Sequence, residues 1–258
     1  MIYQKSYEVK DPKAMIIILH GMAEHSKRYD ELALKFNQEN YECLTYDQIG
    51  HGKSRGKRGE IKSFHEHVDL LHHLVLQEKN RKKQPIYLLG HSMGATIAHL
   101  YAIKYGSIDG IISSSGIFTV PKKMNFLKYT GSFYIRKMAF KTKRMDPYRI
   151  KDQKLTHHLA SDPLMLDKVY GNLLTEICIK AIKYIDKNKN DLTQPVIYFH
   201  GLEDKIISVS SSIKMYETSK STDKTLKLYE HGYHELLNDT EKEEVFKSMI
   251  QWLDKRSQ

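Results

Sequence analysis

The sequence predicts an α/β fold in which a mostly parallel central sheet is flanked by helices on both faces, with an inserted cap. Short aliphatic runs alternate along the chain with segments of helical periodicity, which is the pattern of repeated strand–helix units. The aliphatic runs are continuous, as expected for strands that are buried on both faces. The chain has 258 residues and no internal repeat, so one large domain with a sizeable core is expected.

The expected core elements follow one another in a regular order. Strands are predicted at 14–20, 41–46, 85–89, 109–113, 195–200 and 224–229. Helices are predicted between them at 26–37, 60–78, 93–104, 208–219 and 241–255. The N-terminal residues 2–9 alternate in polarity, which indicates an additional antiparallel strand at the edge of the sheet.

One long stretch, residues 117–192, interrupts this alternation. It contains no convincing core strand, holds three of the six prolines and carries a dense run of basic side chains. We therefore expect a single α/β core formed by residues 1–116 and 193–258, with 117–192 inserted as a cap or lid. The cap is expected over the carboxyl edge of the sheet, because open α/β sheets bind their ligands there.

The net charge of +10 is concentrated in this insertion. Residues 121–151 contain ten lysines and arginines but only one acid, Asp146, so the rest of the chain is close to neutral. Basic residues beside apolar ones favour peripheral contact with an anionic membrane, to which each adds about 1 kcal/mol. A solvated basic face is the alternative. Charge without a recognised binding module argues against nucleic acid as a partner.

Cysteine content and the N-terminal sequence indicate the cellular compartment in which the protein is expected. Cys43 and Cys178 lie in no CxxC motif, which excludes a disulfide scaffold and fits a reducing environment. Residues 1–13 are polar and mixed in charge, unlike a signal peptide, and no apolar run is long enough to span a bilayer. We expect a cytoplasmic protein with peripheral membrane contact. Its oligomeric state has no sequence signature.

A serine occupies the bend between a predicted strand and a predicted helix in "PIYLLGHSMGATIAHL" (85–100). Ser92 is flanked by Gly90 and Gly94, as required in a turn too tight for side chains at those positions. Such a bend raises the hydroxyl above the sheet, and the N–H of Met93 can then stabilise an oxyanion. Ser92 is the predicted nucleophile, and a serine that merely caps the helix is the alternative.

A serine nucleophile needs a histidine base and an orienting carboxylate. His231 and His234 both follow the last predicted strand, and His234 is favoured because the strand end dictates the orientation of His231. Glu203 and Asp204 follow the preceding strand, and Asp204 is favoured because a shorter acid loses less side-chain entropy. The order Ser92, Asp204, His234 is the one expected for this fold class.

The second oxyanion donor is expected in the loop after the first core strand. In "IIILHGMAEHSKRY" (16–29), Gly21 lets the backbone approach closely and the N–H of Met22 is free to donate. An ordinary strand-to-helix turn is the alternative.

A possible metal site also occurs in the sequence. His65, Asp69 and His73 share one face of a predicted helix, which is a spacing that can hold a metal ion. The apolar stripe on the opposite side of that helix indicates that the histidines form its solvated face instead. We therefore expect a reaction that needs neither a metal nor a cofactor.

With these residues identified, the chain resembles the α/β-hydrolase superfamily, and within it the monoacylglycerol lipase and lysophospholipase group. Five motifs carry the resemblance: "HGMAEHSKRY" (20–29), "DQIGHGKSRG" (47–56), "GHSMGA" (90–95), "HGLEDKIIS" (200–208) and "YHELLND" (233–239). The resemblance implies Ser92 as nucleophile, Asp204 and His234 as its partners, and the Met22 and Met93 amides as the oxyanion hole. It also implies a mobile cap that lines an acyl tunnel.

The apolar residues of the cap are expected to select the substrate. Phe126, Tyr129, Phe133, Ile135 and Met138 are the candidates for an acyl pocket, although such spacing is also typical of ordinary core. We expect hydrolysis of carboxylic esters of acylglycerol type, converting monoacylglycerol to fatty acid and glycerol. The alternatives are a lysophospholipase, a small-molecule carboxylesterase or thioesterase, a cofactor-free haloperoxidase, and a non-catalytic lipid-binding protein on the same scaffold.

Overall fold

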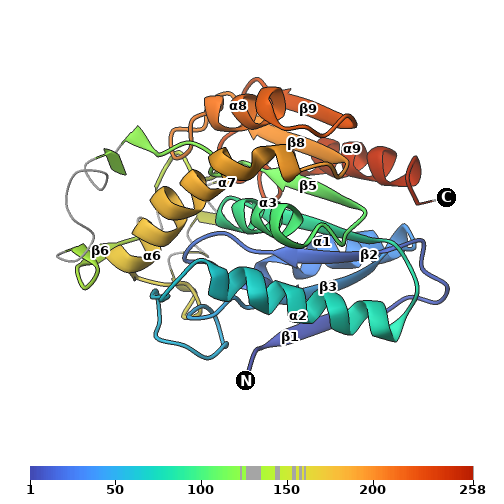
Figure 1. Cartoon of the computed structure of the whole chain (residues 1–258), viewed down its shortest axis with the longest axis horizontal. Helices are drawn as coiled ribbons and strands as arrows, with labels where there is room; N and C mark the ends of the chain where they lie inside the picture. The colour runs from blue at the N-terminus through green and yellow to red at the C-terminus, as the bar shows by residue number, and fades with distance from the viewer. Residues whose placement is uncertain are drawn as a thin grey trace.

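The computed structural model describes residues 1–122, 124–125, 135–142, 146–152, 155–156, 159 and 161–257. Within these residues a central sheet of seven strands has the order β1-β3-β2-β4-β5-β8-β9 (Figure 1). The strands are β1 (Gln4–Tyr7), β2 (Met15–Leu19), β3 (Glu42–Tyr46), β4 (Ile86–His91), β5 (Gly110–Ser114), β8 (Val196–Gly201) and β9 (Lys224–Tyr229). β1 is antiparallel to β3 and every other pair in this sheet is parallel, which confirms the predicted fold class.

Helices cover both faces of the sheet (Figure 1). One face carries α2 (His65–Arg81), α3 (Met93–Tyr105), α7 (Ile182–Asn188) and α8 (Ser210–Thr218), and the other carries α1 (Asp30–Gln38) and α9 (Lys242–Asp254). In β2, Met15, Ile17 and Leu19 pack against the first group, whereas Ile16 and Ile18 pack against the second. Burial on both faces explains why this strand is aliphatic at every position.

The ends of two elements differ from the prediction in ways that matter locally. α2 begins at His65 rather than at residue 60, because the Glu66 carboxylate accepts hydrogen bonds from the N–H groups of Lys62 and Ser63 and holds them in a turn. β4 continues to His91 rather than ending at residue 89. The bend between β4 and α3 therefore falls directly on the residue after His91.

The inserted residues 117–192 lead from β5 to β8, and their described parts add no strand to the central sheet. They form a two-stranded sheet of β6 (Ala139–Lys141) and β7 (Lys168–Tyr170), then α6 (Gly171–Thr175), a π-helical turn (Glu176–Ala181) and α7. β6 and α6 lie at the left of Figure 1. The N–H of Leu166 donates to Ala23 O at 3.0 Å, which joins this stretch to the loop after β2.

Two further expectations concern the membrane and the thiols. Across the described part of the chain, no helix combines the length and the apolar character needed to cross a bilayer. Cys43 and Cys178 are both buried and free. Burial raises the pKa of the Cys178 thiol to about 12, so this thiol stays protonated and unreactive near neutral pH.

Candidate active site

Ser92 occupies the bend between β4 and α3. Its backbone has φ of 53° and ψ of −114°, a conformation that residues other than glycine rarely adopt. A Cβ atom on Gly90 would overlap Ala95 N, and one on Gly94 would overlap Leu19 O. Side chains at these two positions would force the helix away from the strands, which explains the glycine spacing around the serine.

His234 and Asp204 come together from the loops that follow β9 and β8. The distance between His234 Nδ1 and Asp204 Oδ2 is 2.7 Å, and both side chains are buried. The other carboxylate oxygen, Asp204 Oδ1, accepts hydrogen bonds from the N–H groups of Ile206 and Ile207 at 2.8 and 2.9 Å. These bonds fix the carboxylate, and with it the orientation of the imidazole.

The two residues that the sequence analysis ranked lower form a pair of their own. His231 Nδ1 lies 3.2 Å from Glu203 Oε1. The side chains of His231 and Glu203 are 76% and 44% exposed, so water screens this pair. Of these two pairs, the one that is shielded from water is His234 with Asp204.

A second histidine contacts Asp204, and the sequence analysis missed it. His200, near the end of β8, places Nε2 3.1 Å from Asp204 Oδ2 and 3.0 Å from Ile207 O. Its Nδ1 lies 2.7 Å from Ser212 Oγ, which donates when Nε2 carries the proton. The spacing in "HGLED", with His200 four residues before Asp204 across a strand end, is the sequence feature that could have indicated this contact.

The surroundings lower the pKa of Asp204 and raise the pKa of His234. Burial opposes ionisation of Asp204, but His234 and the hydrogen bonds from His200 and His234 hold the pKa of the carboxyl well below its usual value. Burial also opposes protonation of His234, but the Asp204 carboxylate outweighs it and raises the pKa of the imidazole. Asp204 is therefore an anion at neutral pH, beside an imidazole of increased basicity.

The predicted oxyanion donors, Met22 and Met93, lie on segments that pack against each other. Met93 is the first residue of α3, so its N–H is one of the four that a helix leaves without an intrahelical acceptor. Met22 follows Gly21 in the loop after β2, and a Cβ atom on Gly21 would lie only 3.0 Å from the His91 ring. The loop of Met22 therefore runs alongside the residue that precedes Ser92.

The structure describes two of the five predicted pocket-lining residues. Ile135 is buried and belongs to the main hydrophobic cluster, whereas the Met138 residue is 53% exposed. Phe126, Tyr129 and Phe133 lie outside the described residues. Ile135 thus packs as a core residue, and Met138 adds apolar surface to the exterior.

Asp69, the acid of the possible metal site on α2, is bound by other side chains of the protein. The Asp69 carboxylate accepts hydrogen bonds from Lys104 Nζ at 2.7 Å and from the Tyr105 hydroxyl at 2.9 Å. The Tyr105 ring also stacks on His72, with ring centroids 3.7 Å apart. These are the contacts of two packed helices, α2 and α3, rather than those of a cation site.

A second cluster of acids and histidine lies beside the Ser92 bend. Potential ligand atoms of Glu24, His91 and Glu235 all lie within 4.8 Å of one another. Arg28 Nη1 lies 2.9 Å from Glu24 Oε1, however, and Arg149 Nη1 lies 3.0 Å from Glu235 Oε1. Two guanidinium groups neutralise the two carboxylates, so the cluster is an internal ion network and not a metal site.

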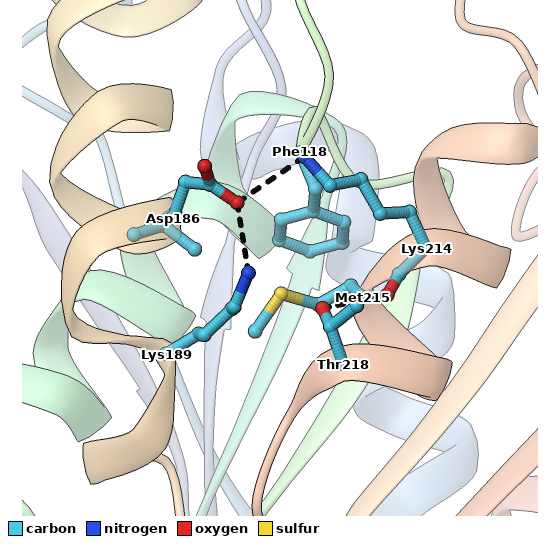
Figure 2. Close-up of a pocket in the computed structure, with 7 residues that line it drawn as sticks. Phe118, Asp186, Lys189, Lys214, Met215 and Thr218 are labelled. Carbon is cyan, nitrogen blue, oxygen red and sulfur yellow. Dashed lines mark hydrogen bonds and ion pairs between the residues drawn. The ribbon is translucent and has the colours of Figure 1, made fainter.

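Figure 2 shows a small hollow between α7 and α8. It is lined by Phe118, Ile185, Asp186, Lys189, Lys214, Met215 and Thr218. The Asp186 carboxylate lies 3.1 Å from Lys189 Nζ and 3.2 Å from Lys214 Nζ, so its charge is neutralised. The lining contains no nucleophile paired with a base, and the bend at Ser92 is therefore the better candidate for ester chemistry.

The parallel sheet and the strained serine at a strand-to-helix bend define the class of protein, an α/β-hydrolase. A family model described as "Serine aminopeptidase, S33" matches residues 10–241, and the chain belongs to this family.

Relatives place the chain more narrowly, in the monoacylglycerol lipase and lysophospholipase-like group. Human monoglyceride lipase is 30% identical over 261 residues, which cover 95% of this chain and 84% of the human protein. The rat monoglyceride lipase is 31% identical over 87% of this chain and 76% of its own length. The crystal structure of monoacylglycerol lipase from Paleococcus ferrophilus has the same fold, with a TM-score of 0.88 at 24% identity over 99% of both chains. The protein is a carboxylic ester hydrolase.

Proposed function

We propose that this protein hydrolyses monoacylglycerol to fatty acid and glycerol through an acyl-enzyme on Ser92, with His234 as base and Asp204 as its orienting acid. The observation that carries the proposal is the buried 2.7 Å contact between His234 Nδ1 and Asp204 Oδ2, next to the strained bend at Ser92. The ring centroids of His234 and of His91, the residue before Ser92, lie 4.8 Å apart, which supports a single site for the serine and the base. The names of the mammalian relatives support the choice of substrate.

In the proposed reaction, His234 Nε2 accepts the hydroxyl proton while Ser92 Oγ attacks the ester carbonyl. The N–H groups of Met22 and Met93 stabilise the resulting oxyanion. The carbon–oxygen bond to glycerol then breaks as His234 returns its proton to the leaving oxygen. His234 next deprotonates a water molecule, which attacks the acyl-enzyme. The bond from the acyl carbon to Ser92 Oγ then breaks as His234 returns the proton to Oγ, and the fatty acid is released. Asp204 stays ionised and holds the proton of the neutral imidazole on Nδ1.

A panel of esters tests the choice of substrate. We expect kcat/KM for a monoacylglycerol to exceed that for a lysophospholipid, a triacylglycerol and a short p-nitrophenyl ester by about tenfold or more, because a fitted alcohol site adds differential transition-state binding. Fatty acid release by mass spectrometry measures all of them except the chromogenic ester. Highest activity on the lysophospholipid would replace the proposed substrate but keep the mechanism. Binding of these lipids with no turnover would favour the lipid-binding alternative.

We also propose that residues 117–192 form a cap over the site. Three contacts support this arrangement, all of them with loops that follow core strands. Leu166 N donates to Ala23 O, one residue from Met22. Asp162 Oδ2 lies 2.8 Å from His25 Nε2, also in the loop after β2. The third contact is the ion pair of Arg149 with Glu235, the residue after His234.

Peripheral contact with an anionic membrane remains a proposal for the basic segment 121–151. Arg136, Lys137 and Lys141 are exposed there, and the exposed Met138 lies among them in the sequence. Two of the ten basic residues are not available for lipid, because Arg149 pairs with Glu235 and Lys151 with Glu241. Fewer charges than the sequence count therefore face the exterior.

Reversing two of these charges is expected to weaken membrane binding. Each basic residue near an anionic surface contributes about 1 kcal/mol, so Lys137→Glu/Lys141→Glu is expected to lower the affinity for phosphatidylserine-containing vesicles by about 30-fold or more. Vesicle sedimentation at two salt concentrations measures the change. Lys79→Glu/Lys220→Glu removes two exposed lysines outside the segment and serves as the control. An equal loss in both variants would contradict a localised contact.

A further inference from the structure

Four charged side chains and one histidine are buried together beside the proposed catalytic residues: Glu24, Arg28, His91, Arg149 and Glu235. Arg28 binds both acids, with Nη1 2.9 Å from Glu24 Oε1 and Nη2 against Glu235 Oε2. Arg149 also reaches both acids, with Nη1 3.0 Å from Glu235 Oε1 and 3.6 Å from Glu24 Oε1. The acid side chains are at most 2% exposed and the arginine side chains at most 13%. The network is thus shielded from solvent.

The network joins segments that are far apart in the sequence. Glu24 and Arg28 follow β2, His91 precedes Ser92, and Glu235 follows His234. Arg149 is the one member from the inserted residues 117–192. With the Arg149 charge, the network holds two carboxylates and two guanidinium groups and is neutral overall. His91 adds no charge at neutral pH, because burial lowers the pKa of its ring to about 4. Removing one arginine would leave a buried carboxylate uncompensated.

Arg149 holds the loop of His234 by both its main chain and its side chain. The N–H of Glu235 donates to Arg149 O at 3.1 Å, and the two side chains form the ion pair described above. From the core side, Ser115 Oγ donates to the carbonyl oxygen of His234 at 2.8 Å. The loop is therefore clamped between the core and the inserted segment, immediately beside the imidazole.

We propose, on the basis of the function proposed above, that Arg149 is a positioning residue: by binding Glu235 it fixes the loop that places His234 for proton transfer with Ser92. The position of His234 then depends on the packing of the inserted segment against the core. A displacement of about 1 Å caused by a change remote from the reacting atoms can lower a rate by roughly 100-fold. A loss of the Arg149–Glu235 contact is therefore expected to appear in kcat.

The same contact gives an electrostatic signature that a purely structural role would lack. Four titratable or charged groups face His234. The carboxylates of Asp204 and Glu235 favour its protonated form, and the Arg149 guanidinium opposes it. The fourth group is the ring of His91. Loss of the Arg149 cation is expected to raise the pKa of His234, and loss of the Glu235 anion to lower it. Because the base acts when neutral, the acidic limb of kcat/KM shifts to higher pH in the first case and to lower pH in the second.

The test uses Arg149→Met in the full chain with a short soluble ester, so that lipid binding does not limit the rate. We expect kcat per folded molecule to fall by about 10- to 100-fold with KM changed less than about twofold, and the acidic limb to move to higher pH. The folded fraction is taken from a thermal unfolding curve. Arg58→Met is the matched control, because Arg58 also links the core to the inserted segment, through Leu164 O at 3.1 Å, without joining the network. Its kcat is expected to equal that of the wild type.

A charge-balanced variant covers the case in which Arg149→Met fails to fold. Arg149→Met/Glu235→Gln leaves Glu24 and Arg28 as a neutral pair, so it avoids a buried uncompensated charge, yet it still lacks the clamp. We expect its kcat per folded molecule to remain at least about fivefold below that of the wild type.

The outcomes separate this proposal from the function on which it rests. Wild-type kcat in either variant, with an active wild type and an inactive Ser92→Ala, would overturn the positioning role alone. If the wild type is no more active than Ser92→Ala, the proposed function and the positioning role both fail. A decrease equal to that of Arg58→Met would show only that the inserted segment needs its links to the core, and would also overturn the specific role of Arg149.

Discussion

Ser92→Ala is expected to abolish ester hydrolysis, with kcat lowered by about 10⁶. The hydroxyl oxygen that the substitution removes is the atom that would bond to the acyl group. The scaffold should tolerate the change well, because alanine is smaller than serine and has a similar difficulty at φ of 53°. The expected phenotype is therefore a folded protein without turnover.

Two measurements check this expectation, namely fatty acid release and covalent labelling by a fluorophosphonate probe followed by intact mass. The wild type is expected to gain the mass of one probe molecule, and Ser92→Ala none. Ser113→Ala, at a buried serine within β5, is the matched control and should keep wild-type turnover and labelling. Substantial turnover in Ser92→Ala would show that this serine is not the nucleophile.

The part of the site that the sequence predicted depends on local constraints. Gly90 and Gly94 can be identified because each faces backbone atoms at a distance that no side chain permits. His234 and Asp204 can be placed because the ends of neighbouring parallel strands meet at one edge of the sheet, where the registers of β4, β5, β8 and β9 bring their following loops together. Chain order and strand position are both visible in the sequence.

The buried ion network is different, because no local pattern marks it. Arg149 and Glu235 are separated by 86 positions, and each resembles an ordinary surface charge in the sequence. Arg149 even lies within a basic run, which suggested exposure, yet its side chain is 13% exposed and bound to two acids. Only the folded arrangement shows that Arg149 turns inward, because the contact depends on how the inserted segment docks.

Asp204→Asn is the second substitution with a very large expected effect, a decrease in kcat of about 10⁴. The amide that replaces the carboxylate can donate a hydrogen bond to His234 Nδ1, which would stabilise the tautomer with its proton on Nε2. That tautomer cannot accept the proton of Ser92. The N–H groups of Ile206 and Ile207 can still bind the remaining amide oxygen, so the loop is expected to keep its conformation.

The pH dependence provides an independent check on the same variant. In the wild type the Asp204 carboxylate raises the pKa of His234, so the acidic limb of kcat/KM is expected above the ordinary imidazole value of about 6.5. Without the carboxylate this pKa falls, and the limb of the residual activity moves to lower pH. Glu203→Gln is the control, since Glu203 belongs to the exposed pair with His231 and should leave both kcat and the limb unchanged. If Asp204→Asn lost less than about tenfold in kcat and kept the wild-type limb, Asp204 would not be the residue that orients the base, because an anion 2.7 Å from Nδ1 must affect both quantities.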